Sequence, residues 1–528
     1  MLPTSRARPD GGRPSRQQAG AGRLPRQGLW FHFLYVTTLG WLVLQLPPVM
    51  LDSRSQQFVL IVGIVGLWRY SWGGVHLVRS LIYRRIVFPR WRAQADALGD
   101  TARPGHLYLL VTSFRIPTGT TRDVYASVIE EAIRYGAPTT IVASLVEMAD
   151  ERLVKELFRS YSPPPHVRLT LVRLHGTGKR DGLACAFRAI SREHPPEGFL
   201  VAVIDGDSLL TPGLLAKCVP FFRMRPRLGA LTTDEVCEVE GSRIFRNWYA
   251  LRFAQRHIAM SSVSLSRRVL TLTGRMSMFR GALLTDPSFI ARVELDWIDH
   301  WRLGRFRFLT GDDKSTWYWM LQNGHEMIYV PDVKVLTIET PPDPSFLVSS
   351  RTLMRRWFGN MLRTNARAVA LGPRPMGLFT WWCIVDQRLS IWTTLIGPAG
   401  VVLATVAVTP FAPFYYLCWI GFTRYLLTLS LLTARPAVSA AYPFLLYYNQ
   451  LMGALVKSKI IFQLDRQRWT RQNTTLDRGL SRWQEGFSRT VASSLQFASI
   501  GTLFFVVALL IHVIDWPDPL FWASKVGL

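Results

Sequence analysis

Long apolar runs lie towards both ends of the chain, and a more polar region separates them. The runs occupy residues 29–50, 58–78, 386–409, 411–434, 440–463 and 494–514. About 20 apolar residues in a helix cross the hydrocarbon core of a bilayer. The pattern therefore predicts membrane-spanning helices on either side of a separate middle region.

Residues 100–345 show a different pattern, in which short apolar runs alternate with helical stretches. The clearest apolar runs are 106–114, 139–146, 167–174 and 199–205. Continuous apolar runs of this length are typical of buried parallel strands, and their alternation with helices indicates a doubly wound α/β sheet. Ligands bind such sheets beyond the carboxyl ends of the strands, so we expect functional residues there.

Positive charge is concentrated beside the apolar runs. The chain has 62 Lys and Arg against 36 Asp and Glu, a formal charge of +26. A nucleic-acid-binding protein would carry such charge on a continuous basic domain, whereas basic flanks of membrane helices are typical of cytoplasmic loops. We therefore expect no nucleic-acid partner, and we place the N-terminus and the middle region on the cytoplasmic side.

A strongly basic segment, 464–493, lies between the last two apolar runs. If every run crossed the membrane, this segment would lie outside, against the preference of Lys and Arg for the cytoplasmic side. We therefore assign 440–463, which carries Lys457 and Lys459, to an interfacial helix. Five spans remain, and the C-terminus is expected outside.

The predicted organisation follows from these patterns. It comprises a disordered basic tail (1–28), two spans with a basic flank (29–90), the α/β domain (100–345), interfacial helices (346–376), spanning and interfacial helices (377–463), the basic loop (464–493) and a last span (494–514). No cleavable signal is evident before the first span. The five cysteines lack CxxC spacing, so neither a disulfide framework nor a cysteine metal cluster is expected.

The first candidate for chemistry is Asp205-Gly206-Asp207, at the end of the apolar run 199–205. Two carboxylates at a strand end lie over the ligand crevice of the sheet. Mg²⁺ and Mn²⁺ prefer oxygen ligands, and magnesium commonly bridges one or two carboxylates to phosphates. We therefore predict a divalent metal at Asp205 and Asp207; the alternative is an ordinary Asp-Gly turn.

Asp312 and Asp313 open a later helical stretch. A carboxylate at this place could cap the helix, because aspartate is favoured at helix N-termini. In the same crevice as Asp205, it could instead be the general base that deprotonates an attacking sugar hydroxyl. The adjacent Lys314 is a candidate ligand for phosphate or for a sugar carboxylate.

The loop 175–183, HGTGKRDGL, combines glycines with Lys179 and Arg180. Backbone amides and cations in such a loop suit the binding of a diphosphate. The spacing does not match GxxxxGK[ST], so a P-loop is not predicted. A flexible basic loop is the alternative interpretation.

Two arginine–tryptophan clusters lie near the membrane runs. In the first, Arg356 is a candidate for contact with a diphosphate and Trp357 for stacking on an acceptor sugar; snorkelling at the membrane surface is the alternative. In the basic loop, Trp469 and Arg471 are candidates for closing over a nucleotide, and contact with lipid headgroups is the alternative.

These features together resemble the processive family-2 glycosyltransferases, which include cellulose, chitin and hyaluronan synthases. The order agrees: two spans, an α/β domain with DGD and then GDD, an RW helix, further spans and a WTR loop. Longer segments are similar to those of the mannuronan synthases, the alginate polymerases of bacteria. They are VTSFR (111–115), HGTGKRDGLA (175–184), AVIDGD (202–207), LRFAQRHI (251–258), HWRLGRFRFLTGDDKS (300–315), DQRLSIWT (386–393), YYNQLMGALVK (447–457) and DRQRWTRQNT (465–474).

The resemblance covers nearly everything from about residue 55 onward. It implies a GT-A-like cytoplasmic domain in a multi-pass protein of the bacterial inner membrane. It also implies inverting, processive transfer from GDP-mannuronate to a growing β-1,4-linked mannuronan chain. By analogy, the site would consist of Asp205 and Asp207 (metal and diphosphate), Lys179 and Arg180 (near the diphosphate), Asp313 (base), and Arg356 and Trp357 (the RW of a QxxRW motif). Leu353 stands where that motif has Gln, and Glu147 is the nearest acidic candidate for the nucleobase.

The resemblance also implies partners that the residues themselves do not reveal. Such polymerases work with a PilZ-domain co-polymerase that senses cyclic di-GMP, within an envelope-spanning secretion complex. Two alternatives stay open: another family-2 synthase, similar to hyaluronan or cellulose synthases, and a non-catalytic membrane scaffold of a secretion complex. A scaffold has no need for paired carboxylates at both a strand end and a helix start.

Overall fold

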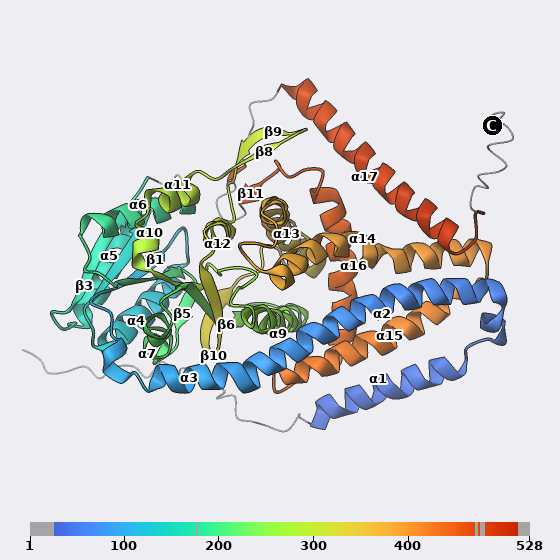
Figure 1. Ribbon diagram of the computed structural model, residues 1–528, viewed down its shortest axis with the longest axis horizontal. Coiled ribbons are helices and arrows are strands. Elements are labelled where there is room, and N and C mark those ends of the chain that lie inside the picture. The colour runs from blue at the N-terminus through green and yellow to red at the C-terminus, as the bar shows by residue number, and fades with distance from the viewer. Residues whose placement is uncertain (1–25, 176–177, 470–473, 476–480, 516–528) are drawn as a thin grey trace, which may run out of the picture.

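An α/β domain lies at one end of the molecule, and long helices extend from it (Figure 1). The structure is a computed structural model that describes residues 26–175, 178–469, 474–475 and 481–515. Most of the expected tail 1–28 and the candidate Arg471 fall outside these residues. The predicted architecture, an α/β domain between apolar helices, is confirmed.

The domain is built on one eight-stranded sheet. In spatial order its strands are β3 (Val167–Arg173), β2 (Thr139–Leu145), β1 (Leu107–Thr112), β4 (Leu200–Asp205), β7 (Met276–Arg280), β6 (Leu228–Val239), β10 (Glu326–Glu339) and β5 (Ser208–Leu210). The four predicted strands, β1 to β4, are parallel neighbours. β7 pairs antiparallel with β4 and β6, and β5 pairs antiparallel with β10, so the sheet is mixed.

Alternate residues of β1 face two separate cores. Leu109 packs with helix α4 (Thr118–Tyr135), whereas Leu110 packs with α6 (Lys179–Arg192). Successive side chains of a strand point to opposite faces, so a strand covered by helices on both sides is apolar throughout. This explains the uninterrupted apolar runs in the sequence.

Further helices and one hairpin complete this part of the molecule. They are α5 (Met148–Ser160), α7 (Leu214–Cys218), α8 (Pro220–Met224), α9 (Arg243–Ser264), α10 (Gly281–Leu284), α11 (Pro287–Glu294), α12 (Asp312–Gln322), α13 (Phe346–Ala370) and a hairpin of β8 (Trp297–His300) and β9 (Gly304–Arg307). α9 packs both on β6 and along α2 (Ser53–Ile82). This helix therefore ties the sheet to the apolar helices.

The other apolar helices are α1 (Arg26–Leu44), α14 (Leu378–Ala407), α15 (Ala412–Ser430), α16 (Tyr442–Ile460) and α17 (Arg482–Leu510). Three helical stretches of the described chain are long and apolar enough to cross a membrane: 55–96, which runs from α2 through α3 (Phe88–Asp96), 378–407 and 482–510. The apolar part of α1, 28–44, is shorter. Leu67, Val406 and Phe497 on the long helices are 69%, 86% and 75% exposed, which suits contact with lipid.

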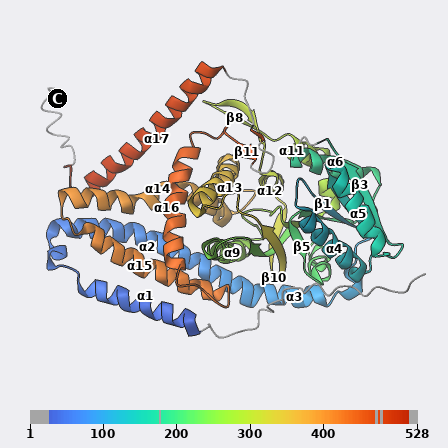
Figure 2. The same cartoon turned by 180° about the vertical axis from the view of Figure 1, so that it is seen from behind.

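α16 runs across α14 and α15, whereas α2, α14 and α15 extend along a common direction (Figures 1 and 2). This orientation is in keeping with the interfacial helix expected at 440–463. The number of membrane spans stays a prediction.

α17 begins at Arg482, inside the segment 464–493 that the sequence assigned to a basic loop. Ser481 and Gln484 form a capping box, in which each side chain bonds the backbone amide of the other residue. The sequence prediction placed this segment in a loop because it is strongly charged, and it did not use the Ser-x-x-Gln spacing that marks the start of a helix. Two short strands, β11 (Arg468–Trp469) and β12 (Thr474–Thr475), pair within the remaining loop.

Candidate active site

A cavity of about 400 Å³ opens at the carboxyl ends of β1 and β4. The starts of α6 and α12 and one side of α9 and α13 also line it. This is the edge of the sheet where the sequence placed the ligand crevice. The structure brings together seven predicted site residues at this cavity: Lys179, Asp205, Asp207, Asp312, Asp313, Arg356 and Trp357.

The DGD turn is clamped between two strands of the sheet. The Gly206 amide donates to the Thr112 carbonyl of β1 at 2.9 Å, and the Ile338 amide of β10 donates to the Asp207 carbonyl at 3.0 Å. A Cβ on Gly206 would lie 2.7 Å from the Thr112 carbonyl oxygen. Glycine is therefore required here because the backbone of β1 passes too close for a side chain.

Lys179 joins the two acidic motifs. Its Nζ lies 2.5 Å from a carboxylate oxygen of Asp205 and 2.9 Å from one of Asp312. Burial opposes the charged form of Lys179, but the two carboxylates more than compensate and raise its pKa. Burial acts to raise the pKa of Asp312, yet Lys179 and Arg180 hold it below its ordinary value. Asp312 is thus an ion-paired carboxylate and a poor acceptor for a substrate proton.

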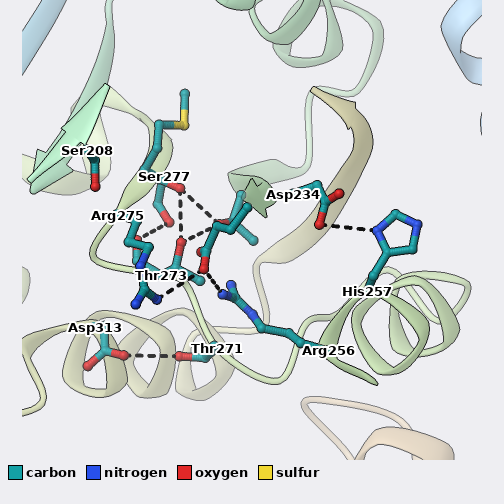
Figure 3. A network of polar contacts seen from close by, with 12 residues as sticks. Ser208, Asp234, Arg256, His257, Thr271, Thr273, Arg275, Ser277 and Asp313 are labelled. Atoms are coloured by element: carbon teal, nitrogen blue, oxygen red, sulfur yellow. Dashed lines mark hydrogen bonds and ion pairs between the residues drawn. The ribbon is translucent and has the colours of Figure 1, made fainter. Parts of the chain in front are cut away.

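Asp313 differs from Asp312 in its surroundings. The Thr271 hydroxyl donates to its Oδ2 at 3.4 Å (Figure 3). Burial raises the pKa of Asp313, and the neighbouring Asp312 carboxylate raises it further. A carboxylate with a raised pKa is a stronger base, so Asp313 is the better of the two candidates for proton removal.

Arg180 and Lys314 do not line the cavity, contrary to the expectation from the sequence. The Arg180 guanidinium donates to the carbonyls of Val293 and Thr310, at 2.8 and 3.1 Å, and to the Ser315 hydroxyl at 3.0 Å. These hydrogen bonds hold the start of α12 in place without exposing Arg180 to the cavity. The Lys314 ammonium donates to the Leu270 carbonyl at 2.6 Å, and burial lowers its pKa to about 8.

The other predicted residues lie in varied places. Glu147 is exposed just before α5 and does not line the cavity, although Ser144 and Val146 beside it do. The Trp357 ring stacks on Trp248 at a centroid distance of 5.7 Å. Trp469 lies in β11, and its side chain, like the whole of Arg471, falls outside the described residues.

A basic wall of the cavity was missed in the sequence. Arg252 and Arg256 of α9, together with Arg275, also line the cavity. Arg275 lies 3.0 Å from Glu235 and 2.6 Å from Glu339, and Arg256 also pairs with Glu235. The spacing of two arginines four residues apart on one helix was the available signal, because such residues share a helix face.

The donor set suits a divalent cation. Asp205 and Asp207 offer hard oxygen ligands on one turn, and a bound diphosphate would supply more. The Lys179 ammonium beside Asp205 shows that this position favours positive charge. Among the described residues, no group of three or more His, Cys, Asp or Glu side chains is arranged to hold a metal alone. A metal here would therefore depend on substrate oxygens as well.

A buried aspartate holds the base of α12 in place. Asp296 is fully buried, pairs with Arg367 at 2.6 Å and accepts a hydrogen bond from the Ser315 hydroxyl at 2.6 Å. We expect Asp296→Ala to lower the free energy of unfolding by about 3–5 kcal/mol, because it leaves the largely buried Arg367 without its carboxylate partner. Thermal unfolding of the purified protein measures this. Asp299→Ala is the control, since Asp299 is 79% exposed, and equal midpoints for the two variants would contradict the prediction.

Comparisons with known proteins identify relatives of this chain. A family profile described as "Glycosyltransferase like family 2" matches residues 104–360. The chain is 50% identical over 475 residues to "Glycosyltransferase alg8" of Pseudomonas syringae pv. tomato, which covers 90% of this chain and 96% of that protein. It is 46% identical over 480 residues to "Glycosyltransferase alg8" of Azotobacter vinelandii, covering 91% and 97%.

Solved structures show weaker similarity. One is described as "Mannosyltransferase PcManGT from Pyrobaculum calidifontis in complex with GDP-Man and Mn2+". It is 18% identical, with a TM-score of 0.44, and the match covers 72% of this chain and 98% of that one.

Proposed function

Because the chain belongs to the family-2 glycosyltransferases, as its alg8 relatives and the family profile establish, we propose that it polymerises mannuronate from GDP-mannuronate into β-1,4-mannuronan, the precursor of alginate. The observation that carries the proposal is the convergence of Asp205, Asp207 and Asp313 on one cavity at the strand ends. The choice of sugar is supported by the long segments that are similar to those of mannuronan synthases.

Asp313 is the proposed general base. It accepts the proton of the acceptor hydroxyl while the hydroxyl oxygen attacks C1 of the donor sugar. The bond from C1 to the GDP oxygen breaks as the new glycosidic bond forms, so the configuration at C1 is inverted. Burial, which raises the pKa of Asp313, favours this proton transfer.

The other carboxylates and Lys179 bind and orient the donor. Asp205 and Asp207 would hold a Mg²⁺ or Mn²⁺ ion, which when bound neutralises charge on a departing diphosphate. Lys179 leaves its contacts with Asp205 and Asp312 to bind a phosphate oxygen. Trp357, which is partly exposed and lines the cavity, offers aromatic surface for a sugar ring.

The membrane arrangement is part of the proposal. We place the protein in the bacterial inner membrane with the α/β domain cytoplasmic, the growing chain leaving between the apolar helices. The three long apolar helices support membrane association, and the basic flanks of the first two apolar runs support the orientation. A PilZ-domain co-polymerase responding to cyclic di-GMP and an envelope secretion complex complete the proposed assembly.

A panel of labelled donors tests the proposal. Membranes carrying the protein, its co-polymerase and cyclic di-GMP receive radiolabelled GDP-mannuronate, UDP-glucuronate or UDP-glucose. Incorporation into polymer from GDP-mannuronate alone is the expected result. Incorporation from a UDP-sugar would keep the fold and mechanism but refute the substrate, and no incorporation from any donor would favour the scaffold alternative.

The raised pKa of Asp313 gives a pH prediction. As pH falls, Asp313 becomes protonated and cannot act as a base, so kcat/KM falls on the acid side. Because the pKa of Asp313 is raised, kcat/KM should begin to fall at a pH above the ordinary aspartate pKa of about 3.9. In Asp312→Asn the neighbouring negative charge is removed, so the acid limb should move to lower pH. Initial-rate profiles measure this, with aliquots returned to neutral pH to exclude irreversible loss; an unmoved limb would contradict the prediction.

A further inference from the structure

One cation on the wall of the cavity has no carboxylate partner among the described residues. Arg252 of α9 lines the cavity and is partly exposed to it. Its guanidinium lies 4.1 Å from the centroid of the Trp357 ring and 4.9 Å from that of Trp248. It donates to the Asn449 side chain of α16 at 3.4 Å. Three elements that are distant in sequence therefore hold this side chain at the cavity.

The ion pairs beside Arg252 do not include it. Arg256 and Arg275 share Glu235 and Glu339, two cations against two carboxylates. Arg252 adds a third cation to this group. Burial lowers its pKa to about 10, and the positive charges of Arg275 and Arg256 act in the same direction, yet it remains charged near neutral pH. An uncompensated charge in a buried setting is costly unless a ligand of opposite charge occupies the site.

Resting on the proposed function, we propose that Arg252 binds the carboxylate of the uronate substrate and so selects charged sugars over neutral hexoses. A guanidinium matches a carboxylate in a planar, two-point geometry. The partly exposed ring of Trp357 beside it suits the apolar face of a sugar ring. A site built for a charged group rejects an analogue that lacks the group, because its own polar atoms are then unpaired.

Arg252 belongs to different elements from Lys179, Asp205 and Asp207. The phosphate-binding groups proposed above, Lys179 with Asp205 and Asp207, lie at the end of β4 and the start of α6. Arg252 lies instead where α9 meets α13 and α16, towards the apolar helices. The carboxylate it binds belongs either to the donor sugar or to the last sugar of the growing chain.

Two variants of one helix test the inference. Arg252→Gln removes the charge, and Arg246→Gln removes an exposed arginine of α9 that does not line the cavity. The affinities of the purified full-length proteins for GDP-mannuronate, GDP-mannose and GDP are measured, together with GDP release and polymer formation. If the glutamine variant does not fold, the same measurements are made on Arg252→Lys, which keeps the charge but loses the two-point geometry.

The two sources of the carboxylate give different results. If it belongs to the donor, Arg252→Gln weakens GDP-mannuronate binding about tenfold or more and leaves GDP binding unchanged. If it belongs to the chain end, all three affinities stay unchanged, but polymer formation falls about tenfold or more. Behaviour equal to that of Arg246→Gln would overturn the inference. An equal loss of GDP and GDP-mannuronate affinity would overturn it too, by showing a diphosphate contact.

The controls separate this inference from the function on which it rests. If the wild-type protein polymerises a neutral or UDP-linked sugar, the proposed function fails whatever Arg252 does. If the wild-type protein polymerises GDP-mannuronate and Arg252→Gln matches the control, only the inference about Arg252 fails.

Discussion

Asp313→Asn is expected to stop polymer formation while the protein still binds its donor. Asparagine has the same shape as aspartate, so the cavity and the contact with Thr271 are kept. It cannot take up the proton of the acceptor hydroxyl, and general base catalysis typically contributes about 10²–10⁴-fold. The rate of GDP-linked sugar transfer should fall by about that factor, with the affinity for GDP-mannuronate little changed.

The measurement is polymer formation and donor affinity on the same preparations. Asp123→Asn is the matched control, because Asp123 is exposed on α4 and does not line the cavity. If Asp313→Asn polymerises within about tenfold of the wild type, the assignment of the base is wrong. If the affinity for GDP-mannuronate also falls sharply, Asp313 contributes to substrate binding and is not only a general base.

Gly206→Ala is the second change with a large expected effect. The added Cβ would lie 2.7 Å from the Thr112 carbonyl oxygen, 2.8 Å from the Ser113 hydroxyl and 3.0 Å from Ser113 Cα. Two of these atoms belong to the backbone of β1 and its continuation, so the DGD turn must move instead. Displacement of catalytic groups by about 1 Å can cost about 10²-fold in rate, and we expect a loss of at least this size.

A second alanine variant isolates the effect of crowding. Gly119→Ala lies in the first turn of α4, where a Cβ would meet nothing within 4 Å, and it should retain wild-type activity. Metal-dependent donor binding and polymer formation are compared for the two variants. Full activity of Gly206→Ala would mean that the turn does not place the carboxylates for catalysis.

The four aspartates of the site could be predicted because each pair stands at a recognisable place in the sequence. Asp205 and Asp207 follow an apolar strand, and Asp312 and Asp313 open a helix. Parallel strands end at one edge of a sheet, so these motifs were expected to meet there. The structure confirms that they line one cavity.

Adjacent residues with different roles were harder to separate. Lys179 and Arg180 are neighbours in one motif, but only Lys179 lines the cavity. Asp313 and Lys314 are also neighbours, but only Asp313 lines the cavity. Side chains next to each other on a helix point in different directions, and the direction that faces the cavity depends on how α6 and α12 pack.

The basic wall could not be predicted from local signals. Arg252 and Arg275 come from separate elements, and β7, which follows Arg275, enters the sheet antiparallel between β4 and β6. Sequence periodicity predicts which segments are strands but not their order in a mixed sheet. Only the three-dimensional pairing shows that Arg252, alone of the three arginines, lacks a carboxylate partner among the described residues.

The central claim is that this cavity transfers mannuronate from GDP to a growing polymer. The most direct test is analysis of the product that purified protein makes, with its co-polymerase and cyclic di-GMP, from radiolabelled GDP-mannuronate. We predict one GDP released per sugar incorporated, and a polymer that a mannuronate-specific lyase degrades completely. A lyase-resistant product, or release of GDP with no polymer in the presence of active co-polymerase, would contradict the claim.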